Sequence, residues 1–120
     1  MSTSLHGLRT VIYPAPDLDA AKRWWSSFLG MDPYFDEPFY VGFSPGGYEL
    51  GLLPDGDPVD GALAYWGVDD VAAAVQSARS AGASEHSPIS DVGEGIITAC
   101  VKTPSGSIVG FIYNPHFALS

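Results

Sequence analysis

The sequence has little cysteine and little positive charge. Cys100 is the single cysteine among 120 residues, so the chain can form no internal disulfide and no zinc site built on cysteines. Lysine and arginine number 5 against 14 aspartates and glutamates, which gives a net charge of −9. This charge argues against nucleic acid and against an anionic membrane as partners, because both are themselves negatively charged.

Long apolar runs are also missing, and we expect no signal peptide. No apolar stretch approaches the ~20 residues that a membrane helix needs. The opening residues, MSTSLHGLRT, lack the basic start and the apolar stretch of a signal peptide. We therefore expect a cytoplasmic protein. Because 46% of the 120 residues are hydrophobic, the chain can bury the core of one domain.

The first half of the chain begins with a predicted strand and a predicted helix. Residues 8–17, LRTVIYPAPD, are typical of a β-branched strand that prolines end. Residues 17–30 predict a helix, with Asp17 as its N-cap and Gly30 as the residue that closes it. The apolar side chains that recur along this helix at helical spacing are Leu18, Ala21, Trp25, Phe28 and Leu29.

Strands follow this helix. Residues 39–53, FYVGFSPGGYELGLL, predict a hairpin that turns at residues 44–47, where proline and glycine gather. Residues 54–61, PDGDPVDG, predict a turn-rich linker to the second half of the chain.

The second half repeats this order. Residues 62–70 predict a strand, and residues 70–82 predict a helix. Residues 87–95, SPISDVGEG, predict a loop with a short strand near it, and residues 96–115 predict a second hairpin that turns at residues 103–106.

The two halves form a weak internal repeat. Residues 10–17 and 63–70 share an offset of 53 residues, and residues 49–54 and 110–115 share an offset of 61. A βαβββ unit leaves one face of its sheet uncovered by its helix, so two such units favour a paired structure. We expect one domain over residues 1–120, with module 1 at about residues 6–55, the linker at about residues 54–61 and module 2 at about residues 62–116.

Three segments carry a resemblance to a known family: YPAPDLDAAKRWWSSFLGMDPY, AYWGVDDVAAAVQSARSAGA and VKTPSGSIVGFIYNP. They resemble the strand–helix openings and the closing hairpin of the vicinal oxygen chelate superfamily, which includes glyoxalase I, bleomycin-resistance proteins and extradiol dioxygenases. The resemblance implies an α+β fold in which two βαβββ modules pair into a curved sheet around a cavity, with the helices outside. It also implies a homodimer.

Metal-dependent members of that family take ligands from the first and last strands of each module. By the two offsets, these positions fall here on Thr10, Glu49, Leu63 and Gly110, and the three histidines fall elsewhere. Glu49 alone is a ligand type, whereas divalent metals need several protein donors. We therefore expect no metal and no other cofactor.

Alternation along the strands assigns the predicted faces. If the first hairpin pairs Gly42 with Glu49, then Glu49 and Tyr40 share the face that meets the ligand. The residues that fall on the opposite, helix-covered face are Phe39, Val41, Phe43, Tyr48, Leu50 and Leu52. In the second hairpin we expect Ala99 to oppose Gly110, which puts Cys100 on the helix side as a small buried hydrophobe.

The predicted cavity is mostly aliphatic, and its polar residues are Thr10, Tyr40, Glu49 and Tyr65. We interpret the chain as a metal-independent small-molecule-binding protein of the glyoxalase/bleomycin-resistance type, which binds a largely apolar ligand in this cavity. The alternative is a lyase- or isomerase-like enzyme of the same superfamily that uses Glu49 as its catalytic general acid or base, with or without a divalent metal. The residues leave both functions open.

Overall fold

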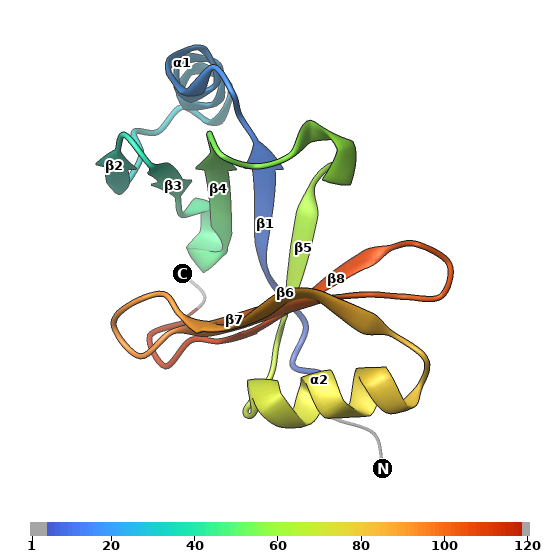
Figure 1. Ribbon diagram of the computed structural model, residues 1–120. Coiled ribbons are helices and arrows are strands. Elements are labelled where there is room, and N and C mark those ends of the chain that lie inside the picture. Colours follow the sequence, from blue (N-terminus) through green and yellow to red (C-terminus); the bar gives the residue numbers. More distant parts are fainter. Residues whose placement is uncertain (1–4, 119–120) are drawn as a thin grey trace. The chain divides into compact units, whose positions relative to one another are not determined.

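The computed structural model describes residues 5–118, which contain two α-helices and eight strands (Figure 1). The predicted α+β class is thus confirmed. The chain divides into two compact units: an N-terminal unit, Thr10–Leu63, and a C-terminal unit, which joins the chain up to Arg9 to Ala64–Phe117. No helix among residues 5–118 is long and apolar enough to span a membrane. The enclosure of a cavity by the two modules, and the single domain, stay predictions.

The N-terminal unit carries a four-stranded sheet in the order β2-β3-β4-β1. Strand β4 runs parallel to β1 and antiparallel to β3. Its elements are β1 (Leu8–Pro14), α1 (Leu18–Leu29), β2 (Phe35–Glu37), β3 (Tyr40–Phe43), a 3₁₀ turn (Pro45–Gly47), β4 (Glu49–Leu53) and a second 3₁₀ turn (Pro58–Asp60).

Helix α1 begins and ends at the predicted residues. The Asp17 carboxylate accepts a hydrogen bond from the Ala20 amide at 3.2 Å, and Gly30 closes the helix in the left-handed conformation with φ 68°. Leu18, Trp25 and other apolar residues of its predicted stripe pack on the core. The prediction for Phe28 was wrong: its side chain is 68% exposed and stacks on Trp24.

The core of the N-terminal unit lies between α1 and the sheet. Its buried residues are Ala15, Val41, Phe43, Leu50 and Leu52, so alternation assigned the helix-covered strand residues correctly. Phe39 and Tyr48 do not join them, and they are 61% and 44% exposed. Each precedes the first residue of its strand, where the chain has not yet entered the sheet. Alternation does not hold outside a paired strand.

The first hairpin pairs in a different register from the predicted one. Gly42 opposes Gly51 and Phe43 opposes Leu50, which is two residues away from the predicted pairing of Gly42 with Glu49. The extra residues are taken up by the 3₁₀ turn, where Gly46 has φ 64°. Because the side-chain period of a strand is two, this shift leaves the paired residues of β3 and β4 on their predicted faces.

The C-terminal unit repeats the order with the sheet β5-β8-β7-β6. The repeat confirms two βαβββ modules in one chain. Its elements are β5 (Leu63–Gly67), α2 (Val71–Ser80), β6 (Ser84–Asp91), β7 (Ile97–Lys102) and β8 (Ile108–Tyr113). The Asp70 carboxylate caps α2 by accepting from the Ala73 amide at 3.0 Å.

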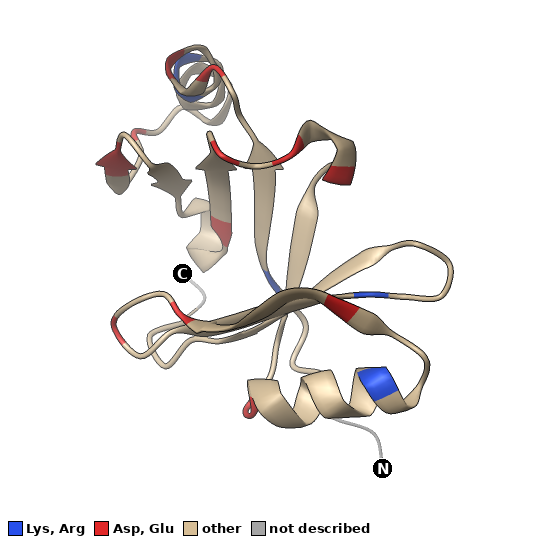
Figure 2. Ribbon diagram, viewed as in Figure 1, with Lys and Arg blue, Asp and Glu red and all other residues tan. Residues whose placement is uncertain are grey.

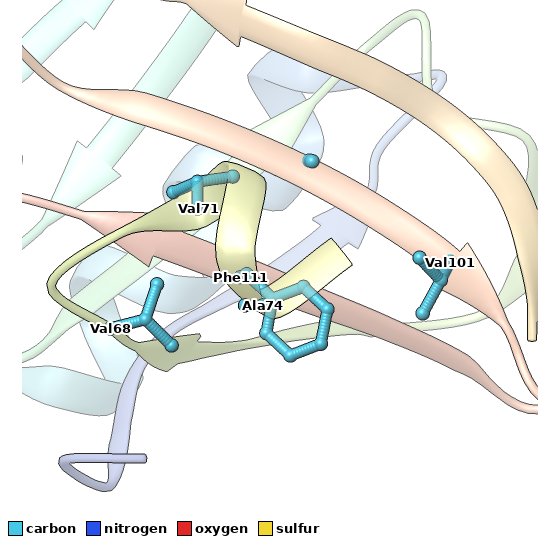
Figure 3. Packing of buried hydrophobic residues seen from close by; sticks show 6 residues of the cluster. Val68, Val71, Ala74, Val101 and Phe111 are labelled. Carbon is cyan, nitrogen blue, oxygen red and sulfur yellow. The ribbon is translucent and has the colours of Figure 1, made fainter. Parts of the chain in front are cut away.

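Helix α2 covers one face of this sheet. Figure 3 shows Val71 and Ala74 of the helix beside Val101 of β7 and Phe111 of β8. These residues form the core of the unit together with Val68 and Ala99, all of them at most 6% exposed.

The second hairpin contradicts the predicted faces. Cys100, not Ala99, opposes Gly110, and Ala99 opposes Phe111. The Thr103 amide donates to the Ser107 carbonyl oxygen at 2.8 Å, so an odd number of residues lies within the turn. A one-residue slip moves every side chain to the other face. Cys100 is buried, as predicted, but it lies on the face of Tyr65 and away from α2.

Strand β6 is longer than the short strand predicted near residues 87–95, and it covers part of the predicted loop. Ser84–Asp91 pairs with β7, but nearly all its side chains are exposed. A strand with little buried surface has no alternation of apolar and polar residues, so its full length cannot be predicted from the sequence pattern.

Candidate functional site

Glu49 begins β4 and points away from α1. Its parallel neighbour on β1 is Thr10, which is 8% exposed. The hydroxyl groups of Tyr34 and Tyr40 each donate a hydrogen bond to a different oxygen of the Glu49 carboxylate, both at 2.5 Å. Short O–H···O⁻ bonds of this length are typical of charge-assisted hydrogen bonds. Both carboxylate oxygens are therefore held by phenols.

Two opposed glycines make room for this arrangement. A Cβ atom on Gly42 would lie 2.8 Å from Glu49 Oε2 and 3.1 Å from the Tyr34 ring. A Cβ atom on Gly51 would lie 2.6 Å from Tyr40 Cζ. Any side chain at either position would displace a ring or the carboxylate. The side chains of Glu49, Tyr34 and Tyr40 therefore pack directly against the backbone of the two glycines.

Aromatic rings continue this surface toward the edge of the sheet. Phe35 opposes Gly42 across β2 and β3, which places it on the face of Glu49. The Phe35 ring centroid lies 6.0 Å from that of Tyr40, 6.5 Å from that of Tyr34 and 5.9 Å from that of Phe39. Such distances are ordinary for contacting rings. Glu49 is thus one carboxylate at the end of an aromatic surface.

Two opposing effects act on the pKa of Glu49. Burial raises the pKa above its ordinary value of 4.5, because a low-dielectric surrounding disfavours the charged form, and the hydrogen bonds from Tyr34 and Tyr40 lower it. Strands β2, β3 and β4 contain no lysine or arginine (Figure 2). The charge is therefore stabilised by hydroxyl groups, without a cationic side chain on these strands.

This balance predicts a pH dependence of stability. Because the folded-state pKa of Glu49 is raised, the folded protein binds this proton more tightly than the unfolded chain does. Its contribution to stability is complete below pH 4.5 and is lost as the pH rises through the folded-state pKa. We expect the free energy of unfolding of wild type, relative to Glu49→Gln, to fall in urea titrations as the pH rises from 4.5 through the folded-state pKa.

The exposed Glu37 of β2 offers a matched control for this measurement. Glu37→Gln removes the same charge, and it should track wild type across this pH range. If the stability of wild type instead rose with pH relative to Glu49→Gln, the phenol hydrogen bonds would outweigh burial.

Three of the predicted ligand-binding residues lie in the N-terminal unit, and the structure brings them together. Tyr40 bonds to Glu49, and Thr10 is its strand neighbour. The fourth, Tyr65, lies in the C-terminal unit, where its ring covers Gly110 and its hydroxyl oxygen accepts from Cys100 Sγ at 3.5 Å. Burial raises the pKa of the Tyr65 hydroxyl. Its role in the site stays a prediction.

Tyr34 was missed by the sequence analysis. It lies between α1 and β2, in a segment for which no strand was predicted, and its amide donates to the Gly42 carbonyl oxygen at 3.0 Å. Predicting a third strand that pairs with the first hairpin would have identified Tyr34, because this pairing places Tyr34 next to Gly42.

The residues present do not fit a divalent metal. Glu49 is the one carboxylate of its cluster, and its neighbours Tyr34 and Tyr40 donate protons to it. Leu63 and Gly110 offer no donor side chain, and no group of three His, Cys, Asp or Glu side chains able to hold a metal occurs within residues 5–118. Zinc sites in proteins have at least three protein ligands.

Two βαβββ modules in one chain, with an acidic side chain at the start of the last strand of the first module, are typical of vicinal oxygen chelate proteins. The chain belongs to the Glyoxalase/Bleomycin resistance protein/Dioxygenase superfamily, whose family model matches residues 7–111. A search by sequence among curated proteins finds no significant match.

Solved structures of this superfamily share the fold. A Mn(II)-bound glyoxalase from Novosphingobium aromaticivorans is 17% identical with a TM-score of 0.75, and the match covers 98% of this chain and 42% of that chain. Methylmalonyl-CoA epimerase from Streptomyces coelicolor, in complex with 2-nitronate-propionyl-CoA, is 16% identical with a TM-score of 0.71 over 98% and 100%. Homoprotocatechuate 2,3-dioxygenase from Brevibacterium fuscum is 13% identical with a TM-score of 0.76 over 98% and 34%.

Proposed function

We propose that the protein binds a small, largely apolar organic molecule at Glu49 without a metal ion. The observation that carries this proposal is the Glu49 cluster: a carboxylate held by Tyr34 and Tyr40 over the glycine pair, on the sheet face away from α1. Sites for small molecules combine apolar and aromatic walls with a few placed polar groups, and this cluster has that composition.

The chemistry of the cluster specifies one part of the ligand. Each carboxylate oxygen accepts one phenol hydrogen bond and keeps further lone-pair capacity, so Glu49 can accept another bond from a hydroxyl or amino group. Tyr34 is 62% exposed and offers apolar ring surface beside Glu49, and Phe39, which is 61% exposed, extends this surface through its contact with Phe35. The ligand thus presents a hydrogen-bond donor next to an apolar or aromatic body.

A second candidate is a lyase- or isomerase-like enzyme with Glu49 as general acid or base. The observation that favours it is the burial of Glu49, which raises its pKa in the direction of the pH at which enzymes work. Tyr34 and Tyr40 would then position the carboxylate and adjust their hydrogen bonds to it as Glu49 gains or loses its proton. The homodimer and the cytoplasmic location stay predictions.

A paired screen tests the proposed function. Aromatic alcohols and amines are screened by thermal shift, in which a ligand at 100 times its Kd adds about 2.7 kcal/mol of stability. For a hit, Glu49→Gln is expected to weaken binding about tenfold or more, because it removes a charged hydrogen-bond acceptor. Glu37→Gln removes the same charge from an exposed site on β2 and should leave Kd unchanged.

The results separate the two candidates. Equal binding by Glu49→Gln and wild type would contradict the proposed site. For a compound that the protein transforms, the enzyme hypothesis predicts that Glu49→Gln stops turnover, and a variant as fast as wild type would exclude Glu49 as acid or base.

A further inference from the structure

Arg9 belongs to an acidic chain and has no carboxylate partner among the residues that the structure describes. The chain holds 14 aspartates and glutamates against 5 lysines and arginines, yet no carboxylate in residues 5–118 lies within 4.0 Å of an Arg9 nitrogen. Arg9 is also partly buried, so its charge is not left to bulk water alone. A partly buried guanidinium that no carboxylate of residues 5–118 neutralises can pair with an anion from outside.

The Arg9 side chain is held in one place within the C-terminal unit. Its guanidinium carbon lies 4.0 Å from the centroid of the Phe117 ring. Its stem crosses Gly67, where an added Cβ atom would lie 2.8 Å from Arg9 Nε. Stacking uses the flat face of a guanidinium and leaves the N–H groups in its plane able to donate. Arg9 is therefore preorganised for a planar or tetrahedral oxyanion.

A hollow of about 160 Å³ lies beside this guanidinium. The residues that line it include His6, Arg9, Gly67, Asp69, Asn114 and Phe117, all from the C-terminal unit. This volume is enough for a small anion.

Besides Arg9, the hollow is lined by Asn114, whose side chain can donate, and by one carboxylate, Asp69. The Asn114 side-chain oxygen accepts from the His116 amide at 2.9 Å, so its amide nitrogen is the group that can donate to a ligand. The one carboxylate of the lining, Asp69, is bound to His6 Nε2 at 2.9 Å, and its side chain is 88% exposed. The Asp69 charge is therefore directed toward His6 and solvent.

From these contacts we infer that Arg9 and Asn114 form a binding site for a small oxyanion, a carboxylate or a phosphate group. The net charge of −9 does not decide against it, because charges beyond a Debye length of about 8 Å are largely screened at physiological salt. This site does not depend on the proposed function at Glu49, which lies in the other unit.

Chemical-shift mapping on the full ¹⁵N-labelled chain tests the inference. Sodium phosphate and sodium acetate are titrated separately, with sodium chloride at equal ionic strength as the reference. We expect saturating amide shifts at Gly67, Asp69 and Asn114 with at least one of the two oxyanions and none with chloride. Saturation by phosphate alone would assign the site to phosphate groups, and saturation by acetate alone would assign it to carboxylates.

Two variants with the same charge change supply the control. Arg9→Gln should weaken the oxyanion that binds by about tenfold or more, whereas Arg79→Gln, an exposed position on α2, should change its Kd by less than about twofold. If Arg9→Gln does not fold, Arg9→Lys keeps the charge but loses the in-plane pair of donors, and it should also bind more weakly. The inference is overturned if neither oxyanion saturates, if the shifts lie away from the hollow, or if the Arg9 and Arg79 variants bind alike.

Discussion

Replacing Phe43 with alanine is expected to lower the free energy of unfolding by about 3–5 kcal/mol. Phe43 is 0% exposed and lies in the core of the N-terminal unit, between strand β3 and helix α1. Its removal takes away buried apolar surface and leaves a cavity that strands and helix can only partly fill. Urea unfolding of wild type and variant, followed by circular dichroism, measures the difference.

Phe39→Ala is the matched control for this experiment. It removes the same side chain from a position four residues earlier that is 61% exposed, where only contacts such as that with the Phe35 ring are lost. We expect a loss of less than about 1 kcal/mol. Comparable losses in the two variants would mean that Phe39 is also a core residue, as alternation alone had predicted.

Gly110→Ala is expected to lower the free energy of unfolding by about 1–3 kcal/mol, although it adds a single methyl group. The new Cβ atom would lie 2.5 Å from Cδ2 of Tyr65, whose ring is 9% exposed. Strand β8 is paired with β5 and with β7, so its backbone cannot move away cheaply. The ring would have to leave its place, and with it the contact of its hydroxyl with Cys100.

A double-mutant cycle identifies the cause of that loss. In a Tyr65→Ala background the obstructing ring is gone, so Gly110→Ala should cost less than about 0.5 kcal/mol. An equal loss in both backgrounds would place the strain in the backbone of β8 rather than against Tyr65.

Features set by neighbouring residues were predictable from the sequence. The caps of α1 depend on Asp17 and Gly30, which act within one turn of the helix, and both are found as predicted. The order of elements in the two modules follows from turn residues and apolar periodicity, which are local signals as well. Glu49 was placed on the correct face because the register error in the first hairpin was an even number of residues.

Features set by turn geometry were not predictable in the same way. The second hairpin differs from the predicted pairing by one residue, and this moved Cys100 from the α2 side to the side of Tyr65. Nothing in the letters of residues 103–106 fixes whether the turn holds an even or an odd number of residues. The side of the sheet on which a residue lies depends on that parity.

The candidate site was predicted in part for a related reason. Thr10, Tyr40 and Glu49 lie on strands with clear alternation, and the structure brings them together. Tyr34, which bonds to Glu49, directly precedes the short edge strand β2. The three residues of β2 are all exposed and show no alternation of apolar and polar side chains. Exposed edge strands leave few signals in a sequence, and the residues that they position are missed with them.

The division of strand β1 between the two units limits how the chain can be cut into fragments. Its first residues, with His6 and Gly7, belong to the C-terminal unit, where the Gly67 amide and carbonyl bond to Gly7 and His6 at 2.8 Å. A fragment that starts after the linker would therefore lack one edge of its own sheet, and the remaining fragment would carry that missing piece. We therefore expect that the two sequence repeats do not fold separately, whereas a circular permutant that begins inside the linker keeps the segment that a fragment loses.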